Sequence, residues 1–523
     1  MSEKRTIMAG ILSVFLAVFA ILVISCAWKA LNWVWLKPKK IEKFLREQGI
    51  KGYSYKFLYG NTKELASLST EARSKPMDLS HHIAPRIMPF VDQTVQKFGK
   101  LSLIWLGPIP RLLVMDPEMI RDILSNKFGH YGKTRTNPLG RFLVTGVISY
   151  EGEKWVKHRR IINPAFHLEK LKMMLPAINT CCNEMIDKWQ KLISSESCEV
   201  NAWPDLQNLT ADVISRTAFG SSYEEGRQVF KLQTEQAKHI IQSLQSIYIP
   251  GSRFLPTKRN RRMKEIYTEV RTLIRHIVNK RENALKSGEA QSDDLLGLLV
   301  ESNLKEIKNN ENSKNVGIAI DEVIEECKLF YLAGQETTST LLVWTMVVLS
   351  MHQVWQEKAR EEVLQVIGKN TPDFDGLSHL KIVTMILYEV LRLYPPVSSL
   401  LRATYKNMKL GNVLLPPGVQ LSLPTLLVHL DQELWGEDAK EFNPNRFSEG
   451  VSNATKNRVA FFPFGWGPTT CIGQNFALLE AKMAIAMILQ HFSFELSSSY
   501  VHAPSIIVTV QPQHGAHLIL HKL

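Results

Sequence analysis

The run from Ile7 to Trp28 contains no charged side chain, and this feature limits the fold of the chain more than any other. A helix needs about 20 apolar residues to cross a bilayer, so the run is long enough to span one. A cleaved signal peptide is the alternative, but the run exceeds a usual signal core and no small-x-small cleavage site ends it. We therefore predict a transmembrane anchor over residues 1–28.

Basic residues gather behind the uncharged run. Lys4 and Arg5 precede it, and it is followed by Lys29, Lys37, Lys39, Lys40, Lys43 and Arg46. Because positive charge accumulates on the cytosolic side of a span, the body of the protein is predicted to face the cytosol. We expect residues 29–50 to form a basic juxtamembrane linker and residues 51–523 to form one domain, since no flexible linker or repeat divides them.

The pattern of the body predicts a mainly α fold with small β-sheets. Helices are expected over Ile266–Leu285, Glu322–Met351 and Leu380–Leu393. Short strands are expected at Leu101–Trp105, Arg111–Met115, Val419–Leu423, Ile506–Val510 and His517–Leu520. The net charge of +13 suits an anionic partner or a membrane surface, and no zinc-finger or RNP pattern indicates nucleic acid.

The stretch "AGQETT", Ala333 to Thr338, interrupts an otherwise apolar helical segment. Ala333 and Gly334 leave space on one face, although glycine costs about 1 kcal/mol in a helix relative to alanine. Glu336 and Thr337 have side chains that carry protons or hold water in a buried site. The alternative is close helix packing through a small residue, with the glutamate in solvent.

Two further segments predict a structural charge cluster. Glu389 and Arg392 in "YEVLRLYPP" are three residues apart and share one helical face. Arg446 in "EFNPNRF" adds an arginine on an irregular segment. A buried carboxylate shared by two arginines would lock a helix to a loop through charge-assisted hydrogen bonds.

The stretch "FFPFGWGPTTCIGQNFALLEAK", from Phe461 to Lys482, places Cys471 among glycines just before an apolar helical pattern. The other cysteines are Cys26, Cys181, Cys182, Cys198 and Cys327, and none has C-x-x-C spacing. Six cysteines in so long a chain do not form a disulfide scaffold. Cys471 differs from the others because its neighbours are residues that shape the backbone.

The order AGQETT, E-x-x-R, N-P-x-R-F and F-G-x-G-x-x-x-C-x-G, together with W-x-x-x-R in "WVKHRR", closely resembles a membrane-bound plant cytochrome P450. Stretches such as "NPLGRFLVTG" and "YIPGSRFLPTKRNRRMKE" resemble the subfamily that contains secologanin synthase, the 7-deoxyloganic acid hydroxylases and several triterpenoid oxidases. The resemblance covers nearly the whole chain and implies the cytochrome P450 fold preceded by one transmembrane helix.

The resemblance implies that the cysteine loop holds a cofactor. Cys471 would be the axial thiolate of haem b, the ligation for which cytochromes P450 are the standard example and which favours cleavage of the O–O bond. Phe464 would cover the proximal face of the haem. The glycines of the loop would adopt backbone conformations closed to other residues, so that amide N–H groups point at the sulfur. These glycines are Gly465, Gly467 and Gly473.

The resemblance also implies roles for the other matching residues. Trp155, Arg159 and, as a weaker candidate, Arg402 would bind the haem propionates. Ala333 and Gly334 would make room over the iron, Thr337 would steady bound dioxygen, and Glu336 would help relay protons. The members of the charge cluster, Glu389, Arg392 and Arg446, would be structural.

Two positions depart from the family pattern. Thr469 stands two residues before the cysteine, where the family usually has an arginine that reaches a propionate. A lost charge-assisted hydrogen bond costs about 1.5–3 kcal/mol when nothing replaces it. Asn445 stands where the family usually has an acid, and we expect it to matter less because Arg446 is retained.

The resemblance implies a monooxygenase on the cytosolic face of the endoplasmic reticulum, supplied with NADPH-derived electrons by cytochrome P450 reductase. Cytochrome b5 is a second candidate partner. The most specific interpretation is oxidative ring cleavage of loganin or loganic acid, with hydroxylation of 7-deoxyloganic acid or a triterpenoid as the alternative. The segments Arg135–Val147, Gln242–Ile249 and Val397–Leu401 would line the pocket. A haem protein without turnover and a basic membrane-surface protein remain as hypotheses from other classes.

Overall fold

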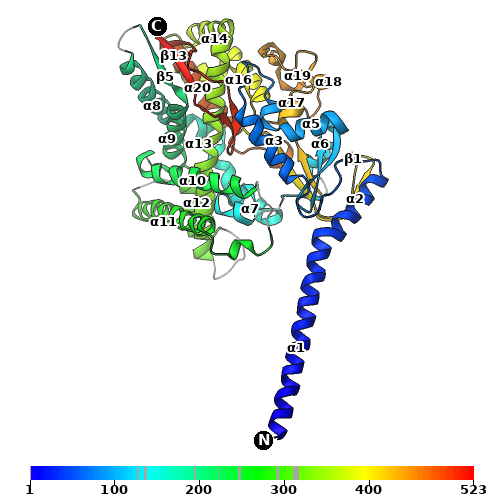
Figure 1. Ribbon diagram of the computed structural model, residues 1–523. Coiled ribbons are helices and arrows are strands. Elements are labelled where there is room, and N and C mark those ends of the chain that lie inside the picture. Colours follow the sequence, from blue (N-terminus) through cyan, green and yellow to red (C-terminus); the bar gives the residue numbers. More distant parts are fainter. Residues whose placement is uncertain are drawn as a thin grey trace.

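The computed structural model describes residues 2–126, 129–134, 138–193, 196–221, 223–244, 249–289, 294–309 and 317–523. A long N-terminal helix projects from a mainly helical body (Figure 1). This helix, α1 (Ser2–Leu31), continues without a break through a π-helical turn (Asn32–Leu36) into α2 (Lys37–Glu47). Among the described residues one helix is long and apolar enough to cross a membrane, and none of its apolar stretch is buried against the body.

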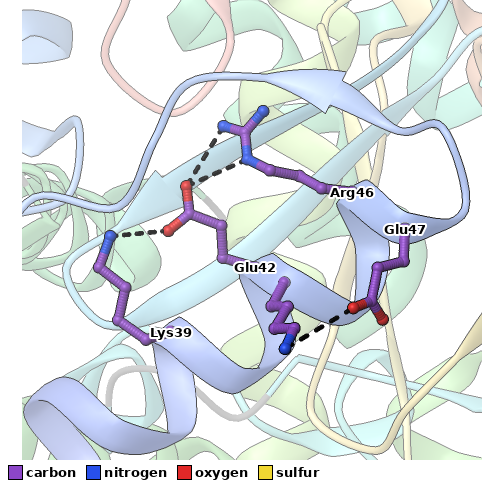
Figure 2. A pocket seen from close by; sticks show the side chains of 5 residues that line it. Lys39, Glu42, Arg46 and Glu47 are labelled. Carbon is purple, nitrogen blue, oxygen red and sulfur yellow. Dashed lines mark hydrogen bonds and ion pairs between the residues drawn. The ribbon is translucent and has the colours of Figure 1, made fainter.

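The segment predicted as a juxtamembrane linker is therefore largely helical, and α2 packs on the body. Glu42 is buried and accepts hydrogen bonds from Lys39 and Arg46 on its own helix (Figure 2). It also accepts the backbone N–H of Tyr55 over 3.2 Å. Gln48 exchanges two hydrogen bonds with the backbone of Leu414, of 3.0 and 2.7 Å. The helix that leaves the anchor is thus joined directly to the body.

The body contains these further α-helices, in chain order: α3 (Thr62–Ser74), α4 (Ala84–Ile87), α5 (Pro89–Phe98), α6 (Pro117–Ser125), α7 (Gly152–Ile162), α8 (Leu168–Leu192), α9 (Ala202–Phe219), α10 (Tyr223–Leu244), α11 (Lys258–Ser287), α12 (Leu295–Asn309), α13 (Ile320–Met351), α14 (Gln353–Val366), α15 (Phe374–His379), α16 (Lys381–Leu393), α17 (Thr425–His429), α18 (Gln432–Trp435), α19 (Gly450–Ala454) and α20 (Gln474–His491). The predicted helices over 266–285, 322–351 and 380–393 lie within α11, α13 and, except for Leu380, α16.

The strands are β1 (Lys51–Gly52), β2 (Leu101–Leu106), β3 (Ile109–Val114), β4 (Tyr131–Gly132), β5 (Ser197–Asn201), β6 (Leu400–Thr404), β7 (Met408–Leu410), β8 (Val413–Leu415), β9 (Gln420–Leu423), β10 (Phe492–Leu496), β11 (Pro504–Ile506), β12 (Val510–Pro512) and β13 (His517–Lys522). One sheet has the order β1-β2-β3-β9-β6-β4 and a second has the order β10-β13-β5. The pairs β11-β12 and β7-β8 form small antiparallel hairpins.

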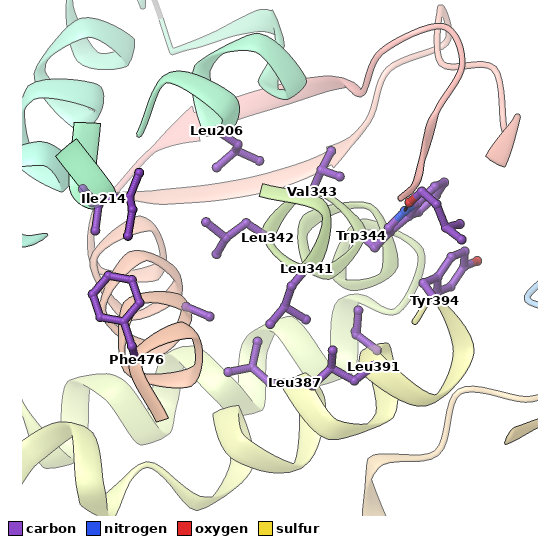
Figure 3. Packing of buried hydrophobic residues seen from close by; sticks show 14 of the residues in the cluster. Leu206, Ile214, Leu341, Leu342, Val343, Trp344, Leu387, Leu391, Tyr394 and Phe476 are labelled. Carbon is purple, nitrogen blue, oxygen red and sulfur yellow. Dashed lines mark hydrogen bonds between the residues drawn. The ribbon is translucent and has the colours of Figure 1, made fainter. Parts of the chain in front are cut away.

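Helix α13 runs through the centre of the body (Figure 1). Leu341, Leu342 and Trp344 on α13 meet Leu387 of α16 and Phe476 of α20 in one apolar cluster (Figure 3). The helix is buried along most of its length because other elements cover most of its sides. The parts of the site described below are held on this central helix and on the elements around it.

One strand prediction was wrong. The stretch Ile506–Val510 is not a single strand, because β11 ends at Ile506 and β12 begins at Val510, with a turn between them. Its β-branched apolar residues match a strand pattern, but they contain none of the Gly, Asn or Pro residues that usually mark a turn. The turn is held instead by long-range contacts, including a bond between the Thr509 and Thr340 hydroxyls of 2.9 Å.

Candidate active site

The segment before α20 forms a tight loop around Cys471. The Cys471 N–H donates to the Phe464 carbonyl over 2.8 Å, and the Gly465 N–H donates to the Phe462 carbonyl over 3.0 Å. Gly465 and Gly467 have φ of 75° and 71°, which L-residues with a side chain rarely adopt. A Cβ on Gly467 would also lie 2.7 Å from the Leu124 carbonyl. The glycines at these two positions are therefore required by the loop.

Gly473 differs from the other two glycines. Its φ is −90°, which any residue adopts, and an added Cβ would make only an ordinary contact of 3.8 Å with Phe166. Its contribution is its backbone N–H, which hydrogen-bonds the Cys471 thiol and lowers the pKa of that thiol. The prediction of a special backbone conformation at Gly473 is thus wrong, whereas an amide directed at the sulfur is present.

The environment of Cys471 fits a side chain that binds a metal or cofactor. The residue is exposed, yet desolvation by the surrounding protein raises the pKa of its thiol. The Gly473 amide and the charge of Arg159 act in the opposite direction. A thiolate placed just before the N-terminus of α20 would also be favoured by the helix dipole.

Two arginines reach this loop from different elements. Arg159 on α7 donates to the Thr470 carbonyl over 2.9 Å, and Arg402 on β6 donates to the Thr469 hydroxyl over 3.0 Å. Burial lowers the pKa of both guanidinium groups. Within the described part of the chain, neither forms a salt bridge, so both have N–H groups left for an anion. Trp155 is half-buried on α7, one turn before Arg159.

Lys133, which the sequence analysis did not single out, is a third cation in this region. Its ammonium group donates to the carbonyls of Val147 and Tyr150 over 3.0 and 2.8 Å. Burial, with the charge of Arg402, lowers the pKa of Lys133 to about 8. Nothing in the local sequence marks this lysine, because its position depends on pairing between β4 and β6.

The AGQETT segment lies in the middle of α13. From Val323 to Ser350 every residue is buried except Ala333, Gly334 and Thr337, which lie on one face. The Thr337 hydroxyl donates to the Ala333 carbonyl over 2.7 Å. A Cβ on Gly334 would lie 2.6 Å from Ile214 of α9, so this glycine serves the close packing of two helices. Its second predicted role, space over a cofactor, stays a prediction.

Aromatic rings connect this part of α13 with the cysteine loop. Phe166 stacks on Phe330 of α13 with ring centroids 5.7 Å apart, and it meets the edge of Phe476 of α20 at 6.4 Å. Phe330 precedes Ala333 by less than one turn, and Phe476 follows Cys471 closely. The two predicted halves of the site, far apart in sequence, are therefore held by one aromatic cluster.

Glu336 is buried, which excludes the interpretation of a solvated glutamate. Its Oε1 atom accepts hydrogen bonds from Thr509 Oγ1 over 2.9 Å and from Gln511 Nε2 over 3.0 Å. Burial raises the pKa of its carboxyl, and the two hydrogen bonds oppose that rise. Thr509 and Gln511 were missed in the sequence, since neither belongs to a recognisable pattern.

The structural cluster has the predicted form. Glu389 and Arg392 are fully buried and form a bidentate pair of 2.7 and 2.8 Å, and Arg446 Nε lies 3.5 Å from the same carboxylate. Arg392 also donates to the carbonyls of His429, Ala439 and Glu441, which joins α16 to the end of α17 and to the segment after α18. Asn445, which stands where the family usually has an acid, is exposed, so this difference from the family pattern affects only the surface.

A cysteine loop at a helix N-terminus, two arginines that form no salt bridge within the described residues, and a buried acid beside a threonine on the central helix together fit a haem-thiolate site. The residues fit haem b, because Cys471 is exposed and the guanidinium groups of Arg159 and Arg402 have N–H donors left for two propionate groups. The family model for cytochrome P450 matches residues 81–516. The chain belongs to the cytochrome P450 family.

Curated relatives of high similarity are plant proteins of one subfamily. The chain is 59% identical to cytochrome P450 CYP72A616 of Paris polyphylla, over 97% of this chain and 99% of that protein. It is 60% identical to cytochrome P450 CYP72A219 of Panax ginseng, over 96% and 97%, and 56% identical to cytochrome P450 72A13 of Arabidopsis thaliana, over 98% and 99%. These matches place it in the CYP72A subfamily of plant cytochromes P450.

Family membership defines the activity at the level of reaction class. The protein is a monooxygenase of the oxidoreductase class that uses haem b with a cysteine thiolate ligand. Electrons come from a reductase, as in other members of the family. The N-terminal apolar helix fits a membrane anchor.

Proposed function

We propose that Cys471 is the axial haem ligand and that this site oxidises a plant terpenoid. The observation that carries the assignment is the cysteine loop, where the Gly473 amide and the charge of Arg159 both lower the pKa of the Cys471 thiol. Haem supplies dioxygen activation when it is bound. Arg159 and Arg402 hold its propionates, Trp155 assists on α7, and Phe464 and Gly467 shape the proximal loop.

On the side of the proposed cofactor site opposite Cys471, we assign the supply of protons to α13. The buried carboxyl of Glu336 has a raised pKa and so retains a proton near neutral pH more readily than a solvated glutamate. Thr337 lies on the exposed face of the helix with its hydroxyl bonded to the Ala333 carbonyl, which leaves its oxygen free to accept a hydrogen bond. Glu389, Arg392 and Arg446 keep the proximal elements in place.

The substrate we propose is an iridoid, loganin or loganic acid, with oxidative cleavage of its cyclopentane ring. Support comes from the sequence stretches that resemble the subfamily containing secologanin synthase. In this reaction the substrate loses hydrogen, a ring C–C bond breaks, and dioxygen leaves as water with the electrons from NADPH. Hydroxylation of 7-deoxyloganic acid or of a triterpenoid is the second candidate, because members of the same subfamily carry out both.

The proposed pocket segments are only partly described. Residues 135–137 and 245–248 lie outside the described residues, whereas 138–147 and 397–401 are described. Leu139 and Leu143 form an apolar cluster with Ile240, Met263 and Leu332 of the surrounding helices. An apolar lining of this kind suits a terpenoid skeleton.

We place the protein in the endoplasmic reticulum membrane, with residues 1–28 as anchor and the body in the cytosol. NADPH-cytochrome P450 reductase is the proposed electron donor, with cytochrome b5 as a second partner. The basic segment after the span supports this orientation.

The test is spectral and chemical. Reduced protein with carbon monoxide is expected to show the red-shifted absorbance of thiolate-ligated haem, and Cys471→Ala should abolish it. Cys181→Ala and Cys198→Ala are matched controls that should keep it. Incubation with reductase, NADPH and each of loganin, loganic acid, 7-deoxyloganic acid and a triterpenoid then identifies the substrate. A normal spectrum in Cys471→Ala would overturn the ligand assignment.

A further inference from the structure

The C-terminal hairpin β11–β12 holds the side chain of Glu336. Thr509 in the turn and Gln511 in β12 both donate to one carboxyl oxygen, Oε1. Within the described residues, the other oxygen, Oε2, receives no hydrogen bond. The two carboxyl oxygens of Glu336 therefore differ in their hydrogen bonding. The residues that cause this difference, Thr509 and Gln511, follow Glu336 by 173 and 175 residues in the chain.

This difference decides where a proton sits. A neutral carboxyl accepts hydrogen bonds at its carbonyl oxygen and donates from its hydroxyl oxygen. With two donors on Oε1, the proton of neutral Glu336 belongs on Oε2, where it is free to be donated. Only burial and the two neutral donors act on the pKa of Glu336, and no charged side chain of the described residues contributes.

The same hairpin is tied to a segment of the proposed pocket. The Val510 N–H donates to the Pro396 carbonyl over 3.1 Å, next to Val397. Val397, which follows Pro396, and Val508, which precedes Thr509, are each 38% exposed. On the helix side, the Thr509 hydroxyl also bonds the Thr340 hydroxyl over 2.9 Å. A ligand that moves Val508 would therefore move the donors of Glu336 as well.

We propose that Thr509 and Gln511 are positioning residues that orient the carboxyl of Glu336 for proton donation from Oε2. The hairpin thereby links contact with substrate to the supply of protons. This inference rests on the proposed role of Glu336 as a proton donor and extends it to two residues outside α13. Neither residue needs to touch the substrate or haem.

The test removes each donor while keeping side-chain volume. Gln511→Leu and Thr509→Val each remove one hydrogen bond to Glu336, and Thr509→Val also removes the bond to the Thr340 hydroxyl. Thr509→Ser keeps the hydroxyl. Ser505→Ala is the matched control, because Ser505 lies opposite Gln511 in the hairpin register and its hydroxyl bonds the Gln511 carbonyl rather than Glu336. All variants are made in the full-length holoenzyme, and the carbon monoxide spectrum shows that the haem site is intact.

The first readout is independent of turnover. The infrared C=O stretching band of neutral Glu336 is assigned by its loss in Glu336→Gln. We expect the band to move to higher wavenumber in Gln511→Leu and Thr509→Val, because a carbonyl oxygen that loses a hydrogen bond has a stiffer C=O bond. Thr509→Ser and Ser505→Ala should leave it in place. An unmoved band in both donor variants would overturn the inference.

The second readout is the coupling of NADPH use to product. We expect product per NADPH to fall about twofold to tenfold in each donor variant, the range that one lost neutral hydrogen bond corresponds to, with peroxide formed instead. The pH profile of coupling should shift, because a lost donor raises the pKa of Glu336 further. Equal losses in Ser505→Ala would show a packing effect and overturn the assignment. If the haem spectrum itself were absent, the proposed function would fail instead.

Discussion

Thr469 departs from the family pattern, which has an arginine at this position, but a positive charge still lies beside it. Its hydroxyl accepts a hydrogen bond from Arg402, so a guanidinium group lies beside position 469. Lys133 acts on the same region, since its charge and that of Arg402 influence each other. We propose that cations from β6 and from the segment after β4 compensate for the missing cation at position 469.

The first prediction concerns haem retention. Arg402→Gln removes a charge-assisted donor, so haem loss to an acceptor protein should become about tenfold to hundredfold faster, as expected for about 1.5–3 kcal/mol. Thr469→Val removes the hydroxyl that orients Arg402 but keeps the arginine charge, so its effect should be about tenfold at most. Thr469→Arg should slow haem loss modestly. Faster loss from the valine variant than from Arg402→Gln would contradict this account.

Glu480 on α20 supplies a second prediction at this scale. It is fully buried, and neither of its carboxyl oxygens has a hydrogen-bond partner within the described residues. Burial raises its pKa well above the usual value for glutamate. The folded protein therefore keeps a proton that the unfolded chain releases above about pH 4.3, so stability falls as pH rises from there toward the folded-state pKa.

Replacing Glu480 with glutamine should remove this contribution. Relative to Glu480→Gln, the native protein should lose about 1.4 kcal/mol of stability for each pH unit above the ordinary glutamate pKa, until the folded-state pKa is reached. Thermal unfolding of both forms between about pH 5 and pH 8 measures the difference. A difference that is constant with pH would show that Glu480 is ionised in the folded protein.

At the scale of elements, helices were easier to predict than the contacts between them. The motifs around Cys471 and Glu389 are local, so their residues could be named from the sequence. Lys133, Thr509 and Gln511 act through contacts with residues far away in the chain, which no local pattern encodes. The turn inside Ile506–Val510 was missed for the same reason, because its stability comes from α13 and not from turn-forming residues.

The contact between α13 and α9 gives a third prediction. A methyl group on Gly334 would lie 2.6 Å from Cγ1 of Ile214, too close for any relaxed contact. Overpacking of this kind costs about 1–3 kcal/mol, which exceeds the gain of about 1 kcal/mol in helix propensity. Gly334→Ala should therefore lower stability, and Ile214→Val in the same chain should restore part of it. Gly140→Ala, with no atom within 4 Å of the new Cβ, is the control.

At the scale of the whole molecule, the anchor helix and the body form one unit. Tyr55 connects them at two points: its N–H donates to Glu42 of α2, and its hydroxyl donates to the carbonyl of Val34 in the π-helical turn. The Leu58 N–H donates to the same hydroxyl over 3.0 Å, which fixes the loop that carries Phe57 and Tyr59. The tilt of α1 in a membrane would therefore set the orientation of the catalytic body.

The last prediction tests that orientation. Phe57 is 58% and Tyr59 41% exposed, and the Phe57 ring lies 5.7 Å from the ring of Trp35, which follows the apolar span by about two turns. Exposed aromatic rings this close to the end of a membrane span favour the membrane–water interface. A nitroxide attached at Phe57→Cys in lipid nanodiscs should therefore be shielded from a water-soluble relaxant. A nitroxide at Leu22→Cys, within the span, should be shielded more strongly. A label at Val354→Cys, which is 64% exposed, should be accessible. Full accessibility at position 57 with protection at position 22 would show that the anchor spans the bilayer while the body stands away from it.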